Sequence, residues 1–213
     1  MKRTVLFAIM SCCILLGIIV LHIAVKEEKN SQGDILPAQI SFFFPEDENA
    51  VQYKLDTTFA LTELPKEAEV VISRVVEGKE GILYHIKINL DVESPERYCY
   101  DWDRFDLGHF YVTDTAIYLI RHEEIGNVLD EEELKKIGMV VCQKTEKADP
   151  IKGQKGWHEW IEVQDNICEF HSYNDLVETG FYEAFIWEEG RGLIEYRSGF
   201  GAMRDHVGLE RIH

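Results

Sequence analysis

Apolar and polar residues alternate along most of the chain after residue 48, which is the pattern of strands that bury one face. The clearest case is the segment 82–90, in which every second residue is apolar: Ile82, Tyr84, Ile86, Ile88 and Leu90. A segment rich in Val and Ile, 69–77, precedes it, and Gly78-Lys79-Glu80-Gly81 between the two is a turn sequence. The pattern therefore predicts a β-hairpin over 69–90.

Three further hairpins and a final strand are predicted in the same way. The hairpins pair 109–112 with 116–120, 157–163 with 167–173, and 181–187 with 193–197, and the last strand covers 207–212. The aromatic residues on these strands include Trp157, Trp160, Tyr182, Phe185, Trp187 and Tyr196. Packing in the core and pairing across strands are their expected roles, and a groove for an apolar ligand or a peptide is the alternative.

One short helix is predicted after residue 130. Asp130 is a suitable N-cap, Glu133 completes a capping box, Leu129 and Leu134 are spaced as a hydrophobic staple, and Gly138 can end the helix. The sum is a mainly β (α+β) fold: an antiparallel sheet built from hairpins, either barrel-like or two-layered, with one or two short helices.

The first 25 residues form a different kind of segment. Lys2 and Arg3 precede an apolar run, residues 5–25, that contains no charged residue. As a helix with a rise of about 1.5 Å per residue, the run would reach roughly 30 Å, the thickness of a hydrocarbon core. The sequence therefore predicts an N-terminal transmembrane helix of the signal-anchor type, with the membrane as partner through residues 5–25.

Two alternatives to an uncleaved anchor stay open. A cleaved signal peptide would release a secreted domain, although His22 is a poor residue two places before a cut at Ala24. A lipoprotein would carry its lipid on Cys12 or Cys13, although the apolar run continues well past both cysteines. A short basic N-terminus favours a C-terminal domain outside the cytoplasm at the cell membrane.

The pattern divides the chain into three parts. These are a signal-anchor segment (1–25), a polar tether (26–47) and a single β-rich domain (48–213). Within the tether, the apolar segment 40–44 could form a first strand or a flap against the domain.

Charge narrows the range of partners. The whole chain has a net charge of −17, and because residues 1–25 contain two cations and no acidic residue, the remainder carries −19. Such a domain repels phosphate backbones, so nucleic acid is excluded as a partner. A cationic protein or another envelope component is the favoured kind of partner. No cofactor is predicted.

Three cysteines follow the membrane segment: Cys99, Cys142 and Cys168. In an oxidising compartment one pair among them could form a disulfide, and the sequence does not select the pair.

The most unusual stretch of the domain is 98–106, YCYDWDRFD. Its residues Tyr98, Tyr100, Trp102 and Arg104 are of the types favoured at contact surfaces, so they are the candidate binding residues. Asp101, Asp103 and Asp106 are weak candidates for an oxygen-ligated metal ion, because the spacing lacks the Gly and the late Glu of the calcium-binding loop.

No catalytic constellation is visible, so whether the protein is an enzyme stays open. The leading hypothesis is a non-catalytic binding or interaction domain. The alternatives are a hydrolase-like enzyme with dispersed carboxylates, such as Glu159, Glu183 and Glu195, and a structural envelope component.

Overall fold

The structure is a computed structural model, and it describes residues 37–58, 64–91, 105–121, 130–176, 180–200 and 205–212. The chain divides into two units, residues 1–36 and Pro37–His213, and the described residues all lie in the second.

Eleven strands and one helix are found in the described residues. In chain order they are β1 (Ala50–Thr57), β2 (Glu67–Glu77), β3 (Gly81–Asn89), β4 (Asp106–Thr113), β5 (Ala116–Ile120), α3 (Glu131–Ile137), β6 (Met139–Gln143), β7 (Trp157–Gln164), β8 (Ile167–Asn174), β9 (Phe181–Glu188), β10 (Gly192–Phe200) and β11 (Asp205–Arg211).

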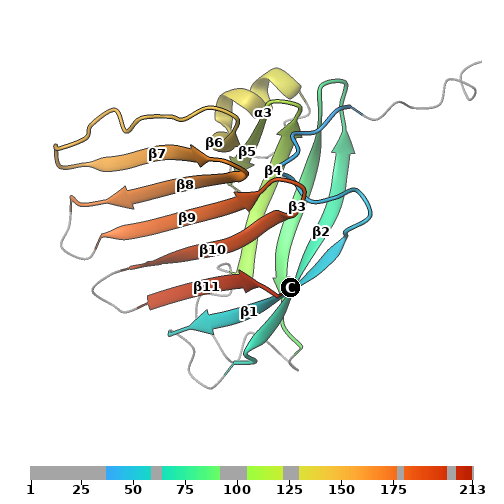
Figure 1. Ribbon diagram of the computed structural model, residues 1–213, viewed down its shortest axis with the longest axis horizontal. Helices are drawn as coiled ribbons and strands as arrows, with labels where there is room; N and C mark the ends of the chain where they lie inside the picture. Colours follow the sequence, from blue (N-terminus) through green and yellow to red (C-terminus); the bar gives the residue numbers. More distant parts are fainter. Residues whose placement is uncertain are drawn as a thin grey trace, which may run out of the picture. The chain divides into compact units, whose positions relative to one another are not determined.

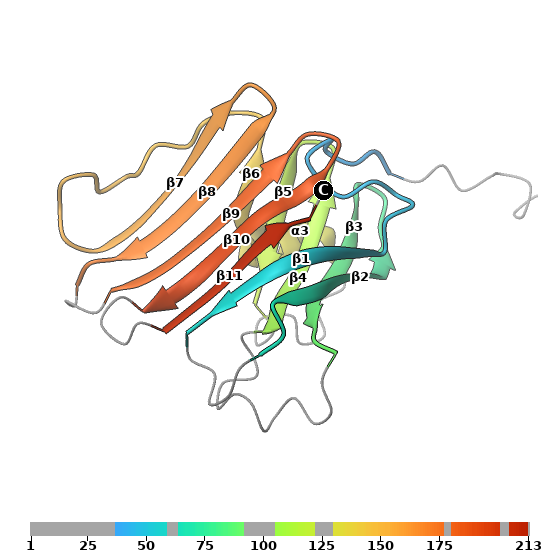
Figure 2. The same ribbon diagram turned by 60° about the horizontal axis from the view of Figure 1, so that its bottom comes forward.

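All eleven strands belong to one antiparallel sheet, in the order β6-β5-β4-β3-β2-β1-β11-β10-β9-β8-β7. The sheet curls until its two ends approach each other, so that β6 packs against β8 and β7 (Figures 1 and 2). The result is a nearly closed, barrel-like sheet, which decides between the two architectures that the sequence allowed.

The predicted hairpins are confirmed. They correspond to the pairs β2–β3, β4–β5, β7–β8 and β9–β10, and the final predicted strand is β11. Sequence analysis did not single out β1 or β6, although Val51, Tyr53 and Leu55 of β1 alternate with polar residues and are buried. In the sheet, β1 joins the two halves by pairing with both β2 and β11.

The core lies inside the curled sheet, where aromatic rings from opposite walls meet. Phe110 of β4 packs edge-on against Phe185 of β9, with ring centroids 5.8 Å apart, and against Trp187, at 6.0 Å. All three side chains are fully buried. Contacts between aromatic rings at this spacing add to the free energy gained by burying their area.

The helix α3 covers part of the outer face of the sheet. Its Leu134 packs with Leu83, Tyr111 and Ile120, which point outward from β3, β4 and β5. Asp130 caps the helix as predicted, by accepting a hydrogen bond from the Glu132 amide at 3.2 Å.

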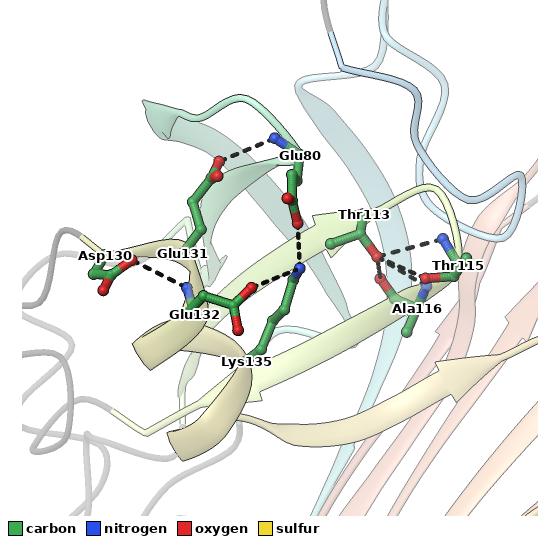
Figure 3. A network of polar contacts seen from close by, with 8 residues as sticks. All are labelled: Glu80, Thr113, Thr115, Ala116, Asp130, Glu131, Glu132 and Lys135. Carbon is green, nitrogen blue, oxygen red and sulfur yellow. Dashed lines mark hydrogen bonds and ion pairs between the residues drawn. The ribbon is translucent and has the colours of Figure 1, made fainter.

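Polar contacts tie α3 to the β2–β3 turn (Figure 3). Lys135 forms an ion pair with Glu80, and Glu131 accepts a hydrogen bond from the Glu80 amide at 3.1 Å. The helix is therefore held by both its apolar face and its charged ends, as so short a helix requires.

The segment Ile40–Phe44 is the flap of the two alternatives that the sequence left open. It crosses the end of the barrel that carries the tight hairpin turns. Its backbone is held there by hydrogen bonds from the Ile40 amide to the Thr113 carbonyl (2.6 Å) and from the Gly190 amide to the Ser41 carbonyl (2.7 Å). The rings of Phe43 and Phe44 enter the core and reach Trp187.

Gly192 makes room for the segment Ile40–Phe44, which we call the plug. It has a φ of +83°, and a Cβ atom at this position would lie 2.6 Å from the Phe44 ring. Only glycine satisfies both the left-handed backbone and the close approach.

No helix among the described residues is long and apolar enough to cross a membrane. The predicted transmembrane segment, residues 5–25, lies outside the part of the chain that the structure describes.

Removing a ring from the plug should destabilise the domain. Phe43 is 4% exposed and packs 4.6 Å from the Tyr84 ring. Phe43→Ala should lower the free energy of unfolding by about 3–5 kcal/mol, measured by urea unfolding followed through tryptophan fluorescence. Val75→Ala, at a position that is 48% exposed, is the control and should change it by less than about 0.5 kcal/mol. Equal effects of the two substitutions would show that the segment is not part of the core.

Candidate functional site

A row of polar side chains crosses the inner face of the barrel wall formed by β7 to β10. Glu159 of β7 is paired in register with Ser172 of β8, Ser172 with Glu183 of β9, and Glu183 with Ser198 of β10. Residues paired in this way share a face of the sheet, so the four side chains form one belt. Figure 2 shows the four strands side by side as one wall.

The belt separates two apolar layers. On the side of the plug, the next inward residues are Ile161, Phe170, Phe185 and Tyr196, all buried. On the other side lie Trp157, Phe181 and Phe200, which we call the aromatic rim.

Glu183 is the most buried charged residue of the belt. Its side chain is 2% exposed, and both carboxylate oxygens accept hydrogen bonds. Arg121 is the residue that follows β5 on the opposite wall, and its guanidinium donates to Oε2 of Glu183. The Tyr196 hydroxyl donates to Oε1 at 3.1 Å. The ion pair therefore connects two walls of the barrel through residues that are 62 positions apart.

Burial is the main reason that the pKa of Tyr196 lies above its usual range, and the negative charge of Glu183 adds to the effect. The phenol stays protonated at every physiological pH and keeps its role as a hydrogen-bond donor. Arg121 is 40% exposed, so the ion pair lies where the interior meets solvent.

The aromatic rim borders this pair on its solvent side. The Trp157 and Phe181 rings stack with centroids 5.7 Å apart, and Phe181 meets Phe200 edge-on at 5.5 Å. Trp157 is 46% exposed and Phe200 37%, both high values for large apolar side chains. The Trp157 indole also donates a hydrogen bond to Glu159 at 3.1 Å, which links the rim to the belt.

A hollow of about 190 Å³ lies between the rim and the ion pair. It is lined on one wall by Leu119, Arg121, Ile137 and Met139, and on the other by Trp157, Ser172, Phe181 and Glu183. An apolar cavity of about 150 Å³ holds one benzene molecule, so this hollow has room for one ring-sized group. Chemically it offers an apolar wall, a serine hydroxyl and one buried ion pair.

A second polar cluster lies on the outer face of β7. His158 is held between two carboxylates, with Nδ1 2.6 Å from Asp149 and Nε2 3.4 Å from Asp175. Each carboxylate also accepts a backbone hydrogen bond from the loop before β7, Asp149 from Ile151 (3.1 Å) and Asp175 from Gly156 (2.5 Å). The cluster therefore fastens the loop 144–156 to the β7–β8 hairpin.

Most residues of the predicted contact loop are not among those that the structure describes. Tyr98, Tyr100, Trp102 and Arg104 lie outside the described residues, as do Asp101, Asp103 and Cys99 and the lipidation candidates Cys12 and Cys13. The predictions made for them stay predictions.

Asp106 is the one metal candidate that is described. Its carboxylate bonds to His85 Nε2 at 2.8 Å and to the Gly108 amide at 2.9 Å, and the His85 contacts and the Gly108 bond lower its pKa against the effect of burial. Among the described residues no group of three or more His, Cys, Asp and Glu side chains is arranged to hold a metal ion.

The carboxylates proposed for the hydrolase alternative separate into two sets. Glu159 and Glu183 share the inner belt, whereas Glu195 neighbours the inward-facing Tyr196 and so points outward, where it pairs with Arg197. Cys142 and Cys168 are free thiols, fully buried on the inner face.

Comparison of the chain with protein-family models, with curated proteins and with solved structures finds no match.

Replacing one partner of the Arg121–Glu183 ion pair should lower the free energy of unfolding more than replacing both partners. Arg121→Met leaves the Glu183 carboxylate buried without its cation, so the free energy of unfolding should fall by about 3 kcal/mol. The double variant Arg121→Met/Glu183→Met removes both charges and should lie within about 1 kcal/mol of the wild type, because neither charge is then left buried without the other. A double variant that is less stable than either single variant, in urea unfolding, would contradict the pair.

The His158 cluster should loosen at alkaline pH. Its hydrogen bond to Asp149 raises the pKa of His158 above the unfolded value of about 6.5. The clamp is therefore complete below pH of about 6.5 and is lost as pH rises through the folded pKa. Both aspartates have lowered pKa values, Asp149 mainly through His158 and Asp175 mainly through the Gly156 amide, so the clamp also fails at strongly acidic pH.

Hydrogen exchange measures this loosening. The protection factors of the Ile151 and Gly156 amides, corrected for intrinsic exchange, should fall above neutral pH in the wild type. They should be low and independent of pH in His158→Asn. The control His171→Asn alters a histidine of the same sheet face outside the clamp and should behave as the wild type. A wild-type profile that is flat from pH 5 to pH 9 would exclude the clamp.

Proposed function

We propose that the domain is a non-catalytic binding module, displayed outside the cytoplasm by the N-terminal segment, and that it binds its ligand between the aromatic rim and the Arg121–Glu183 pair. The observation that carries the proposal is the hollow of about 190 Å³ at this place, which a buried ion pair and exposed stacked aromatic rings border together. The ligand would insert a ring-sized apolar group and place a hydrogen-bonding head at the belt. A peptide side chain or a small amphiphile has this form.

The chemistry of the rim supports binding. Half-exposed aromatic side chains gain the most from being covered, and stacked rings present a flat apolar face to a second ring. Trp157 and Phe181 are already stacked, so little side-chain entropy remains to be lost when a ligand arrives.

The state of Glu183 also favours binding over catalysis. A general acid or base needs an oxygen that can reach the substrate proton. Both oxygens of Glu183 are occupied, one by a guanidinium and one by a phenol. This arrangement suits a residue that orients its neighbours.

The hydrolase-like alternative keeps one observation in its favour. Glu159 and Glu183 lie in the same register row, two strands apart, which places their backbones about 10 Å from each other. Enzymes that activate a water molecule between two carboxylates hold the carboxyl groups about 6.5–9.5 Å apart, and side chains on backbones about 10 Å apart can reach such a distance. The proposal of a structural envelope component needs no ligand at all.

The test is binding of three small aromatic probes: phenol, phenethylamine and phenylacetate. Ligand-detected NMR and tryptophan fluorescence should reveal binding of at least one of them to the wild type. Trp157→Ala should weaken that binding at least tenfold, because a hot-spot aromatic contributes more than about 1.4 kcal/mol.

Trp160→Ala is the matched control. Trp160 lies three residues along the same strand, on the outer face, stacked on His171. It should leave the affinity for the probe unchanged. If no probe binds, or if both tryptophan variants weaken binding equally, the rim is not the binding site.

A further inference from the structure

The barrel has one seam. The strands β6 and β7 are the two ends of the sheet order, and no ladder joins them in the described residues. The segment that follows β6 is joined to β7 by an isolated bridge between Lys147 and Ile161. Its two hydrogen bonds measure 3.0 and 2.9 Å. Elsewhere, neighbouring strands are joined by ladders of four to eight paired residues, so the closure is weakest here.

Two cysteine side chains meet inside this seam. Cys142 lies on β6, where it pairs with Ile117 of β5, and Cys168 lies on β8, where it pairs with Trp187 of β9. Both are 0% exposed, and each thiol shifts the pKa of the other, raising that of Cys142 and lowering that of Cys168, so the two side chains are neighbours. The Cys168 thiol also lies 3.5 Å from the carbonyl of Gln143, the residue after Cys142. The two strands therefore hold their sulfur atoms side by side across the one edge that the backbone barely closes.

We propose that Cys142 and Cys168 form a disulfide in the exported protein and that this bond closes the seam of the barrel. The inference rests on the proposed placement of the domain outside the cytoplasm, where disulfides persist. It selects one pair from the three that the sequence left open.

The oxidant is a disulfide donor of the compartment. One thiolate of the pair attacks the donor disulfide, which forms a mixed disulfide and releases one donor thiolate. The second cysteine thiolate then attacks the mixed disulfide, forms the Cys142–Cys168 bond and releases the second donor thiolate. Two protein thiols are oxidised and one donor disulfide is reduced to two thiols.

The environment gives the two sulfurs different reactivity. The hydrogen bond from Cys142 lowers the pKa of Cys168, while burial raises the pKa of Cys142. In the folded state Cys168 is therefore the thiol that ionises more readily. Since both thiols are buried in the finished fold, the bond forms while the chain folds.

The bond would be separate from the proposed binding site. Cys168 shares an inner face with Phe170 and Ser172, but it lies four residues from Ser172, at the plugged end of β8. Closing the seam should stabilise the barrel without touching the aromatic rim.

The experiment maps thiols in the full-length chain. The protein is expressed with its own N-terminal segment, blocked with iodoacetamide under denaturing conditions without reductant, digested and analysed by mass spectrometry. The expected result is a linked pair of peptides that contain Cys142 and Cys168 and that separate on reduction. Complete alkylation of both residues, or a bond from either of them to Cys99, would overturn the proposal.

Stability provides a second measurement. Reduction of the wild type should lower its Tm by roughly 6–12 °C, the effect of opening a cross-link over a loop of this length. Cys142→Ala and Cys168→Ala should be as unstable as the reduced wild type and insensitive to reductant, whereas Cys99→Ala should behave as the wild type. A wild-type Tm that does not respond to reductant would count against the bond even if the cysteine variants fail to fold.

The two proposals fail in different ways. Binding of the aromatic probe by reduced protein, with weakening by Trp157→Ala, would support the binding site whatever the state of the cysteines. A mapped disulfide without probe binding would support the seam and not the site.

Discussion

The interior of the curled sheet has to be filled from both walls at once, and the contact of Phe110 with Phe185 and Trp187 does this. A sheet of eleven strands leaves an interior that backbone hydrogen bonds cannot fill, so large rings must meet across it. The plug Phe43–Phe44 then closes one end of the barrel by packing against Trp187. The opposite end is left to the polar belt and the aromatic rim.

The strand β9 passes from the exposed rim to the buried core within a few residues. Its inward side chains run from Phe181 through Glu183 and Phe185 to Trp187, so rim, ion pair and core follow each other on one strand. A carboxylate in the middle of such a strand would be costly without partners. Tyr196 supplies one partner from the next strand of the same wall, and Arg121 supplies the other from the opposite wall, so the position of Glu183 depends on the closure of the barrel.

Elements that depend on residues close together in the sequence could be predicted. The hairpin over 69–90 and the short helix after Asp130 each depend on turn or capping residues a few positions apart, and both form as predicted. Core packing was predicted for six strand aromatics, and Phe185, Trp187 and Tyr196 are buried as expected. Trp157 is 46% exposed, and Trp160 and Tyr182 are only partly buried, because alternation does not tell where along a strand the core ends.

The pairing that makes the candidate site was not predictable in the same way. Glu183 was recognised only as one of several dispersed carboxylates. Arg121 follows a strand without any local signal, and only the curvature of the sheet brings it to Glu183. The same holds for Trp157 and Phe181, whose stacking depends on the register of three strands. The alternation of apolar and polar residues fixes which face a side chain takes, but not which wall it meets.

Charge adds a condition on what can enter this site. Within the hollow, Glu183 is neutralised by Arg121. Beside it on the belt, Glu159 lies 3.7 Å from the Lys147 ammonium, so the local charges are balanced. The part of the chain after residue 25 nevertheless carries −19, and its field reaches about 8–10 Å from the surface at physiological ionic strength. An anionic ligand would be repelled before it met the guanidinium, whereas a neutral or cationic one would not. The balanced pair inside the acidic domain therefore favours a ligand with an apolar ring and an uncharged or positively charged head.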